Sequence, residues 1–378
     1  MIYGVMIMKK YAEKAIKAAK IAAISAAFLY FLGDTGAAAE AVGESIQRCI
    51  DIVIPSLFAM MIVSSMITAS GMTALMPRCL GRLSRLIFGI EGRELPVFTF
   101  GMIAGYPVGV KMLCEERSCG RLDKKRAELL SGLCFGAGPA FIFGCISRQL
   151  YSSRSAGLVI LISTVSANII LALLLSVPLR RTAGARSVPR RVSISADMLT
   201  DCVLRSGRAM ADICIMIAAF AAANAALART GVSAAAGELL GKLPDLDRIR
   251  GEVLVAAFLD VTNISKLPCG DWLLLPYISA LTAFGGVCVL LQLRALTAGK
   301  LSLKYFIIMR SAAAVLSFFI CRLIMPFFMT GEVTEVLSPR ISSAGNSSPV
   351  PSAMLIIMTV MLMVEFGGKS SLQHTKSF

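Results

Sequence analysis

The stretch from Gly101 to Lys111, which reads Gly-Met-Ile-Ala-Gly-Tyr-Pro-Val-Gly-Val-Lys, constrains the fold of this chain more than any other. It lies in an apolar run that begins near Leu95, yet it contains three glycines, a proline and a lysine. Irregular backbone at membrane depth is tolerated only where protein or a water-filled cavity surrounds it. Transporters place substrate sites at such breaks, often once in each half of an internal repeat. We therefore predict a re-entrant hairpin over residues 94–113.

A second interrupted segment lies in the other half of the chain. Residues 258–268 read Phe-Leu-Asp-Val-Thr-Asn-Ile-Ser-Lys-Leu-Pro and place polar groups in the middle of an apolar run. The pattern predicts a second re-entrant hairpin over residues 252–270.

The apolar content of the chain requires a membrane. Of the 378 residues, 56% are hydrophobic, and the mean hydropathy is +0.76. Soluble domains are markedly less apolar. We predict an all-α polytopic membrane protein whose main partner is the lipid bilayer.

The net charge of +15 does not indicate a nucleic-acid partner, because the basic residues lie in short segments between apolar runs. That is the distribution of the positive-inside rule. The single histidine, His374, is near the C-terminus, so a histidine-based metal site is not expected. The eleven cysteines include no Cys-x-x-Cys. We expect them to be small apolar helix residues, and expect no disulfide between Cys114 and Cys119 in a reducing cytosol.

The N-terminal segment has two interpretations. Five lysines within residues 1–20 precede an apolar stretch that ends at Leu32, followed by Ala37-Ala38-Ala39. This resembles a signal peptide with a cleavage site near residue 39. The favoured alternative is a retained first helix that starts near Ala15. In both cases the N-terminus is cytoplasmic, and Asp34, Glu40 and Glu44 lie outside.

The basic loops decide between two topologies. If residues 94–113 are re-entrant, the loop 114–126 and the arginine-rich segment between Arg180 and Arg208 are both cytoplasmic. If both hairpins crossed the membrane, the arginine-rich segment would be exported, against the positive-inside rule. We therefore predict two re-entrant hairpins and about eight spanning helices. The helices are expected at 15–32, 49–75, 127–147, 155–179, 209–229, 272–293, 305–329 and 351–367.

The two halves of the chain follow the same order of helix, hairpin, helix and helix, and they enter from opposite sides. This is the inverted-repeat plan of secondary transporters. We divide the chain into an N-terminal segment with the first helix (1–44), a first repeat (45–179), a cytoplasmic basic loop (180–204), a second repeat (205–329) and a segment with an outer loop, the last helix and a cytoplasmic tail (330–378).

Asp260 is the strongest candidate site residue. An acidic group at the bilayer centre costs about 2.5–3.5 kcal/mol and usually faces a cavity or carries ions. With Thr262 and Asn263 it offers oxygen atoms to a cation, a proton or a substrate hydroxyl. The alternative is a shallow segment in which Asp260 is solvated or paired with Lys266.

The lysines near the hairpin tips also have two interpretations. A lysine in a substrate cavity attracts a carboxylate, whereas long basic side chains otherwise extend to the nearest interface. For Lys266 we favour a place in the substrate cavity. For Lys111 extension to the interface is at least as well supported.

The glycines and the proline of the first tip also have two interpretations. Gly101, Gly105, Pro107 and Gly109 let the chain reverse and expose backbone amides toward anionic groups. The alternative is close helix packing through small residues. Tyr106 either stacks on a planar ligand or anchors the tip.

Two further breaks follow the hairpins. Gly136, Gly138 and Pro139 interrupt the first helix, and Gly285-Gly286 precede Gln292 in the second. Gln292 is expected to bond a ligand or a neighbouring helix. Asn168 and Asn224 are interpreted as interhelical hydrogen-bonding residues. No nucleophile–base pair, Gly-x-Ser-x-Gly, His-Glu-x-x-His or phosphate-binding loop occurs, so the chain is not expected to be an enzyme.

Five blocks together resemble a known family. They are Ile54-Pro-Ser-Leu-Phe58, Gly105-Tyr-Pro-Val-Gly-Val-Lys111, Gly138-Pro-Ala-Phe-Ile142, Asp260-Val-Thr-Asn263 and Phe284-Gly-Gly286 followed by Gln292. Their order over residues 45–325 resembles sporulation integral membrane proteins of the YlbJ type. These belong to a wider group with a nucleoside-recognition gate domain, which is similar to concentrative nucleoside transporters.

The resemblance implies passage of a small planar or anionic metabolite across a bacterial cell membrane, and specifically movement of dipicolinate toward the spore at the forespore membrane. From these blocks and from the polar groups of the two hairpins, the candidate substrate-binding residues are Gly105, Tyr106, Pro107, Gly109, Lys111, Gly138, Asp260, Thr262, Asn263, Lys266 and Gln292. No cofactor is implied. Na⁺ or H⁺ as a coupling ion, and a homo-oligomer, are left open.

The chain also departs from the family. Phe135-Gly-Ala137 stands where the family has Asn-Asn-Ser, and Asp260 replaces a Glu. The lost polar cluster motivates an alternative, a non-transporting membrane scaffold for spore or envelope assembly. A third and weaker hypothesis is an ion channel.

Overall fold

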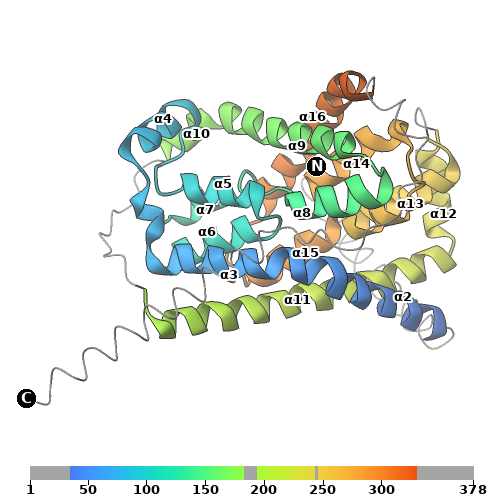
Figure 1. The fold of residues 1–378 in the computed structure, drawn as a ribbon, viewed down its shortest axis with the longest axis horizontal. Coiled ribbons are helices and arrows are strands. Elements are labelled where there is room, and N and C mark those ends of the chain that lie inside the picture. The colour runs from blue at the N-terminus through green and yellow to red at the C-terminus, as the bar shows by residue number, and fades with distance from the viewer. Residues whose placement is uncertain (1–34, 183–193, 243–245, 330–378) are drawn as a thin grey trace, which may run out of the picture.

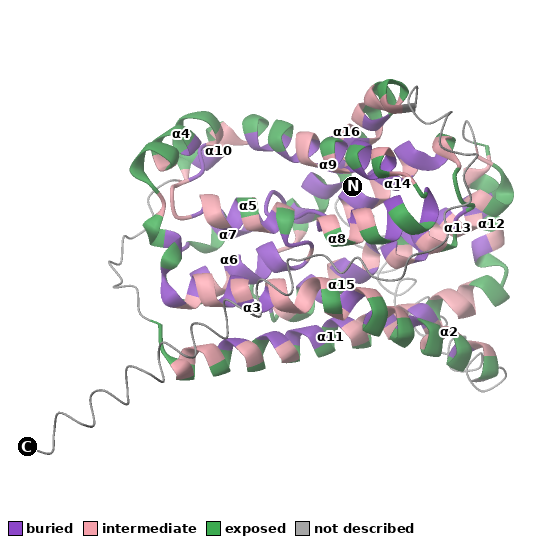
Figure 2. Cartoon of the chain, in the orientation of Figure 1, coloured by how far each residue is buried: buried purple, intermediate pink, exposed green. Residues whose placement is uncertain are grey.

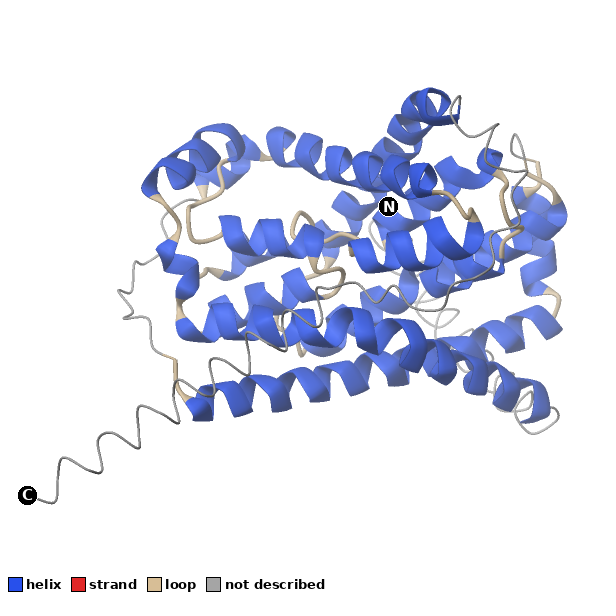
Figure 3. Cartoon of the chain, in the orientation of Figure 1, coloured by secondary structure: helices blue, strands red, loops and turns tan. Residues whose placement is uncertain are grey.

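The computed structural model describes residues 35–182, 194–242 and 246–329. Within these ranges the chain forms helices joined by short loops and contains no strand, which confirms the predicted all-α class (Figure 3). The predicted helices at 15–32 and 351–367 lie outside the described residues, and so does the choice between a signal peptide and a retained helix.

The helices of the first half follow the chain in this order: α2 (Thr35–Arg48), the π-helical η1 (Cys49–Val53), α3 (Ile54–Ser70), the 3₁₀ turn η2 (Met72–Leu75), α4 (Arg78–Phe88), α5 (Leu95–Ile103), α6 (Val108–Ser118), α7 (Lys124–Ser131), α8 (Pro139–Phe141), the π-helical η3 (Ile142–Leu150), α9 (Arg154–Leu174) and α10 (Ser176–Arg181).

The second half continues with α11 (Ala196–Arg229), α12 (Val232–Leu240), α13 (Arg248–Leu259), the 3₁₀ segments η4 (Val261–Lys266) and η5 (Trp272–Leu274), α14 (Leu275–Phe284), α15 (Gly286–Leu296) and α16 (Lys304–Met329). Helix α16 packs along α9 and α14, and α11 packs along α2 and α3 (Figure 1).

Five segments of the described residues are long and apolar enough to cross a membrane: Gly36–Ser70, Arg154–Leu174, Ala196–Arg229, Trp272–Leu296 and Lys304–Phe328. They correspond to the spans predicted at 49–75, 155–179, 209–229, 272–293 and 305–329. The protein is therefore a multi-pass membrane protein.

Several predicted boundaries are wrong. The first of these segments begins well before residue 49, because the alanine-rich α2 continues without interruption into η1 and α3. Glu40 and Glu44 consequently lie on a helix. At α11, Ser195 caps the N-terminus by accepting a hydrogen bond from the Met198 amide, so the helix starts in the segment predicted as a basic loop. Helices α4 and α12 also lie in segments predicted as loops.

The prediction of one spanning helix over 127–147 is wrong. The chain instead forms α7, a non-helical stretch at 132–138, the short α8 and the π-helical η3. The break predicted from Gly136, Gly138 and Pro139 is confirmed, and it divides the segment completely. Proline removes a helical hydrogen bond and the glycines weaken the ladder, so the segment cannot continue as one helix.

Both predicted hairpins are interrupted at their expected tips. The first consists of α5 and α6, which are separated by residues 104–107, and the second consists of α13 and η4, which are separated at Asp260. The first lies at the end of the molecule that holds α4 and α10, whereas α13 lies with α12 at the opposite end (Figure 1).

An ion pair joins the two ends of each hairpin. Glu94, at the start of the first hairpin, pairs with Arg126, which follows its end. Arg250, within α13, has its guanidinium 2.7 Å from the Asp271 carboxylate, which follows η4. Each chain segment therefore enters and leaves at the same end of the molecule, as a re-entrant hairpin requires.

Burial follows the same plan. The breaks and the facing sides of the helices are buried, whereas the outer sides of α9, α11 and α16 are exposed (Figure 2). Large apolar side chains on these outer sides are 62–78% exposed and are suited to contact lipid; they are Leu174, Ile215, Ile308, Phe319, Leu323 and Phe327.

We expect Glu94→Gln to destabilise the protein strongly. Arg126 is 1% exposed, and its guanidinium also donates to the Leu179 and Gly89 carbonyls, so the substitution leaves a buried cation without its counter-charge. Breaking such a pair typically costs about 3–5 kcal/mol. Thermal unfolding of the purified protein measures the effect.

The matched control is Glu252→Gln, which removes a largely exposed pair with Arg248 at a separation of 3.1 Å. Its expected cost is at most about 1 kcal/mol. Equal melting temperatures for the two variants would show that the Glu94–Arg126 pair does not hold the hairpin.

Candidate substrate cavity

Four interruptions of helix meet near the middle of the molecule. Gly105, at the tip of the first hairpin, has φ +89°, and a Cβ there would lie 3.1 Å from the Gly138 nitrogen in the next break. Gly285, between α14 and α15, has φ +92°, and a Cβ there would lie 2.6 Å from the Phe135 ring. Only glycine provides both the left-handed backbone and these approaches.

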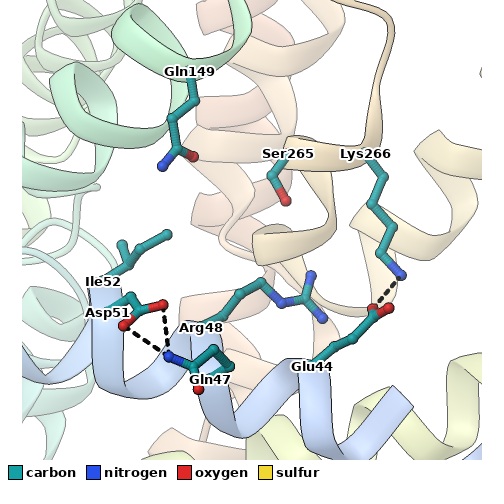
Figure 4. Close-up of a pocket in the computed structure, with 8 residues that line it drawn as sticks. All are labelled: Glu44, Gln47, Arg48, Asp51, Ile52, Gln149, Ser265 and Lys266. Carbon is teal, nitrogen blue, oxygen red and sulfur yellow. Dashed lines mark hydrogen bonds and ion pairs between the residues drawn. The ribbon is translucent and has the colours of Figure 1, made fainter. Parts of the chain in front are cut away.

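A cavity of about 1050 Å³ lies where the breaks meet. Both hairpin tips line it, together with α3, η3, α11 and α15. Of the residues predicted to bind substrate, it contains Gly105, Tyr106, Gly138, Asp260, Thr262 and Gln292. Lys266 lines an adjoining pocket of about 520 Å³ (Figure 4).

Tyr106 presents an aromatic face and a polar group. Its ring stacks on Phe135, with 4.8 Å between the centroids and 15° between the planes. Its hydroxyl is buried and has no hydrogen-bond partner among the described residues. Because a buried hydroxyl normally finds a partner, this group is available to a ligand.

Asp260 is held in place by the turn that follows it. Its carboxylate accepts hydrogen bonds from the Thr262 amide at 3.1 Å and from the Thr262 hydroxyl at 2.9 Å. It is 2% exposed and forms no ion pair within the described part of the chain, while Lys266 pairs with Glu44 at 3.7 Å. The alternative, an Asp260 that is either solvated or paired with Lys266, is therefore wrong.

Asn263 lies beside this turn and secures it. Its amide nitrogen donates to the Ala256 and Asp260 carbonyls, and its oxygen accepts from Arg48 at 3.4 Å. Gln292, on α15, also lines the cavity; it is buried and donates weakly to the Cys288 sulfur, one helical turn earlier.

Lys111 does not extend to an interface and does not line the cavity. Its ammonium group is buried among α3, α6 and α11, where it contacts the Ser65 hydroxyl, the Ser206 hydroxyl at 3.2 Å and Glu115 at 3.4 Å. The expected snorkelling of Lys111 is thus absent.

The remaining tip residues serve packing. A Cβ at Gly109 would lie 2.1 Å from the Cys134 carbonyl oxygen, and Gly101 approaches the same carbonyl, so the first hairpin packs tightly on the segment after α7. Pro107 is buried and follows a cis peptide bond. All eleven cysteines are free, and none forms a disulfide.

Sequence reasoning missed Arg310, which joins two of the breaks. It is 1% exposed, and its guanidinium donates to the Phe135 carbonyl at 3.2 Å, the Ala283 carbonyl at 3.3 Å and Asn168 at 2.7 Å. Asn168 in turn donates to Phe135, which confirms its predicted interhelical role. An arginine six residues into an apolar helix was the signal that identifies this position.

Sequence reasoning also missed two π-helical segments. Both η1 and η3 line the cavity and bring Asp51, Arg148 and Gln149 to one of its ends. Such segments are rare and are frequent at functional sites. Their hydrogen-bond register depends on packing, so the residue pattern alone does not reveal them.

We expect Arg310→Leu to lower the melting temperature of the protein. The substitution removes the Arg310 donor from the Ala283 carbonyl and the Asn168 oxygen, at a typical cost of about 1–3 kcal/mol for each unsatisfied group, while the Phe135 carbonyl keeps the Asn168 amide. The matched control is Lys304→Leu, an exposed cation on the same helix. Unchanged melting of the Arg310 variant would contradict its role at the breaks.

Comparisons with known proteins place the chain near one curated protein. No family model matches the chain, and no solved structure matches it. Over 110 residues, or 29% of this chain, it is 27% identical to the sporulation integral membrane protein YlbJ of Bacillus subtilis (strain 168). The match covers 27% of that protein's length. The chain is therefore related to a sporulation integral membrane protein, as its motifs predicted.

Proposed function

We propose that the protein is a membrane transporter or facilitator for a small planar or anionic metabolite, with dipicolinate export during sporulation as the first candidate. The observation that carries the proposal is the cavity of about 1050 Å³ into which both hairpin tips project. Ligand cavities typically measure about 300–1,000 Å³, are mostly apolar and contain a few convergent polar groups.

The polar groups of the cavity suit a flat molecule with both donors and acceptors. Tyr106 supplies a ring surface and a hydroxyl, Asp260 supplies acceptor oxygens, and Gln292 supplies an amide. The exposed backbone at Gly105 and Gly138 allows a ligand to approach closely.

The cavity has unequal ends, which suits alternating access. Asp51 and Arg148 line it at one end, and the buried cluster around Lys111 lies beyond the first tip at the other. Passage to the second face would require α6 to separate from α3 and α11 at this cluster. Transporters make such changes by moving one part of the repeat against the other.

Flux into or out of reconstituted vesicles tests the proposal, with dipicolinate and nucleosides as substrates. We expect Asp260→Ala and Gly105→Leu each to reduce flux at least about tenfold, because one removes the acceptor and the other fills the junction of the tips. The controls are Asp212→Ala and Gly207→Leu on α11, where the acid is exposed and the glycine has open space around it. Wild-type flux in the Asp260 and Gly105 variants would contradict the site.

A scaffold in spore or envelope assembly is the second candidate, because the name of the related B. subtilis protein refers to sporulation and to no substrate. It predicts no flux and no ligand-dependent rise in melting temperature, since ligands stabilise the state that they bind. Normal sporulation in a strain that carries Asp260→Ala would also favour the scaffold function.

A further inference from the structure

A polar pocket adjoins the inner cavity at the end away from Lys111. Its volume is about 520 Å³, and it shares Asp51, Ile52 and Gln149 with the inner cavity, so the two are direct neighbours. Its walls come from α2 with η1, from η3 and from η4, which lie far apart in the sequence (Figure 4).

Three of the four charged side chains in this pocket are already engaged. Lys266 pairs with Glu44 at 3.7 Å, and both oxygens of Asp51 accept from the Gln47 amide at 3.0 Å (Figure 4). Lys266 is the cation of this pocket that a carboxylate neutralises, and Arg48 is the cation that has no such partner among the described residues. No ion pair to Arg48 occurs within the described ranges, and its hydrogen bond is the long contact of 3.4 Å to Asn263.

Arg48 is also short of hydrogen-bond acceptors. Its Nε is buried and has no partner among the described residues. The guanidinium extends from the end of α2 into the space below Ser265, and the Gln149 side chain points into the pocket from the opposite wall (Figure 4). No hydrogen bond engages the Gln149 amide in the part of the chain that the structure describes.

A carboxylate satisfies both groups. A guanidinium is planar, remains charged at any physiological pH and binds carboxylates through two parallel hydrogen bonds. An amide such as that of Gln149 adds a neutral donor. A neutral planar compound such as a nucleoside offers Arg48 no ion pair, so the pocket distinguishes the two classes.

We propose that this pocket is an outer docking site for carboxylate ligands, with Arg48 as the residue that selects anionic over neutral compounds. The onward step into the inner cavity rests on the proposed transport function, whereas binding at Arg48 does not. The structural role of Arg48, its contact to Asn263, is separate from this selection and is tested separately below.

Binding to the full chain in nanodiscs of zwitterionic lipid tests the proposal. The probes are dipicolinate, benzoate and the neutral diamide of dipicolinate. We expect Arg48→Gln to weaken binding of both carboxylates at least about tenfold and to leave binding of the diamide unchanged, because the lost contact is a charge-assisted pair. Arg48→Lys keeps the positive charge but loses the planar guanidinium, so we expect its affinity for carboxylates to lie between those of the wild type and Arg48→Gln.

The matched control is Lys266→Gln, which removes a cation of the same pocket that Glu44 already neutralises. We expect it to change carboxylate affinity less than about threefold. Equal losses in the two variants, or an equal loss for the diamide, would overturn the assignment to Arg48. Failure of both carboxylates to bind the wild-type protein would overturn it as well.

Two further experiments distinguish a carboxylate site from a general anion site and from a lipid headgroup site. Inorganic phosphate that competes as well as benzoate, or carboxylate binding that disappears in nanodiscs of anionic lipid, would overturn a carboxylate site in favour of a general anion or lipid headgroup site. Carboxylate binding without vesicle flux would leave the Arg48 site in place and remove the transport function. Normal flux of dipicolinate at limiting concentration through Arg48→Gln would leave the transport function in place and remove the role of the Arg48 site.

Discussion

Every backbone donor and acceptor at membrane depth needs a partner within the protein, and the helix breaks of this fold place several of them there. Polar side chains supply the partners. Arg310 bonds the carbonyls of Phe135 and Ala283 on two different breaks, and Asn168 bonds Phe135 again. Asn263 bonds the last turn of α13 in the same manner. The buried polar residues of the bundle are thus a consequence of its interrupted helices.

The interruptions also explain the position of the cavity. Each hairpin is fixed at its base by an ion pair, Glu94 with Arg126 and Arg250 with Asp271. Because the bases are fixed, each tip is held at one position inside the bundle. Two hairpins from opposite ends then meet tip to tip, where loops cannot pack as closely as helices. The space left between them contains the Tyr106 hydroxyl, which has no partner among the described residues, and Asp260, whose carboxylate accepts hydrogen bonds from its own turn.

The sequence predicted the breaks well and their surroundings poorly. Glycine, proline and an acid inside apolar runs act locally, so Gly105 and Asp260 were identified as tip residues from the chain alone. Arg310 and Lys111 depend on which helices lie beside them, and a single sequence does not contain that information. The segment at 127–147 was misjudged because its average hydropathy suits a span, whereas Gly136 to Pro139 interrupt it.

Labelling of two native cysteines tests the opposite entry of the hairpins most directly. Cys119 follows the first hairpin and Cys269 lies at the end of the second, and both are exposed. The variant Cys79→Ser removes the other exposed cysteine among the described residues. With a membrane-impermeant maleimide on intact cells and on inverted vesicles, we expect Cys269 to react from outside and Cys119 only from the cytoplasmic face. Reaction of both from the same face would contradict the meeting of two hairpins inside the bilayer.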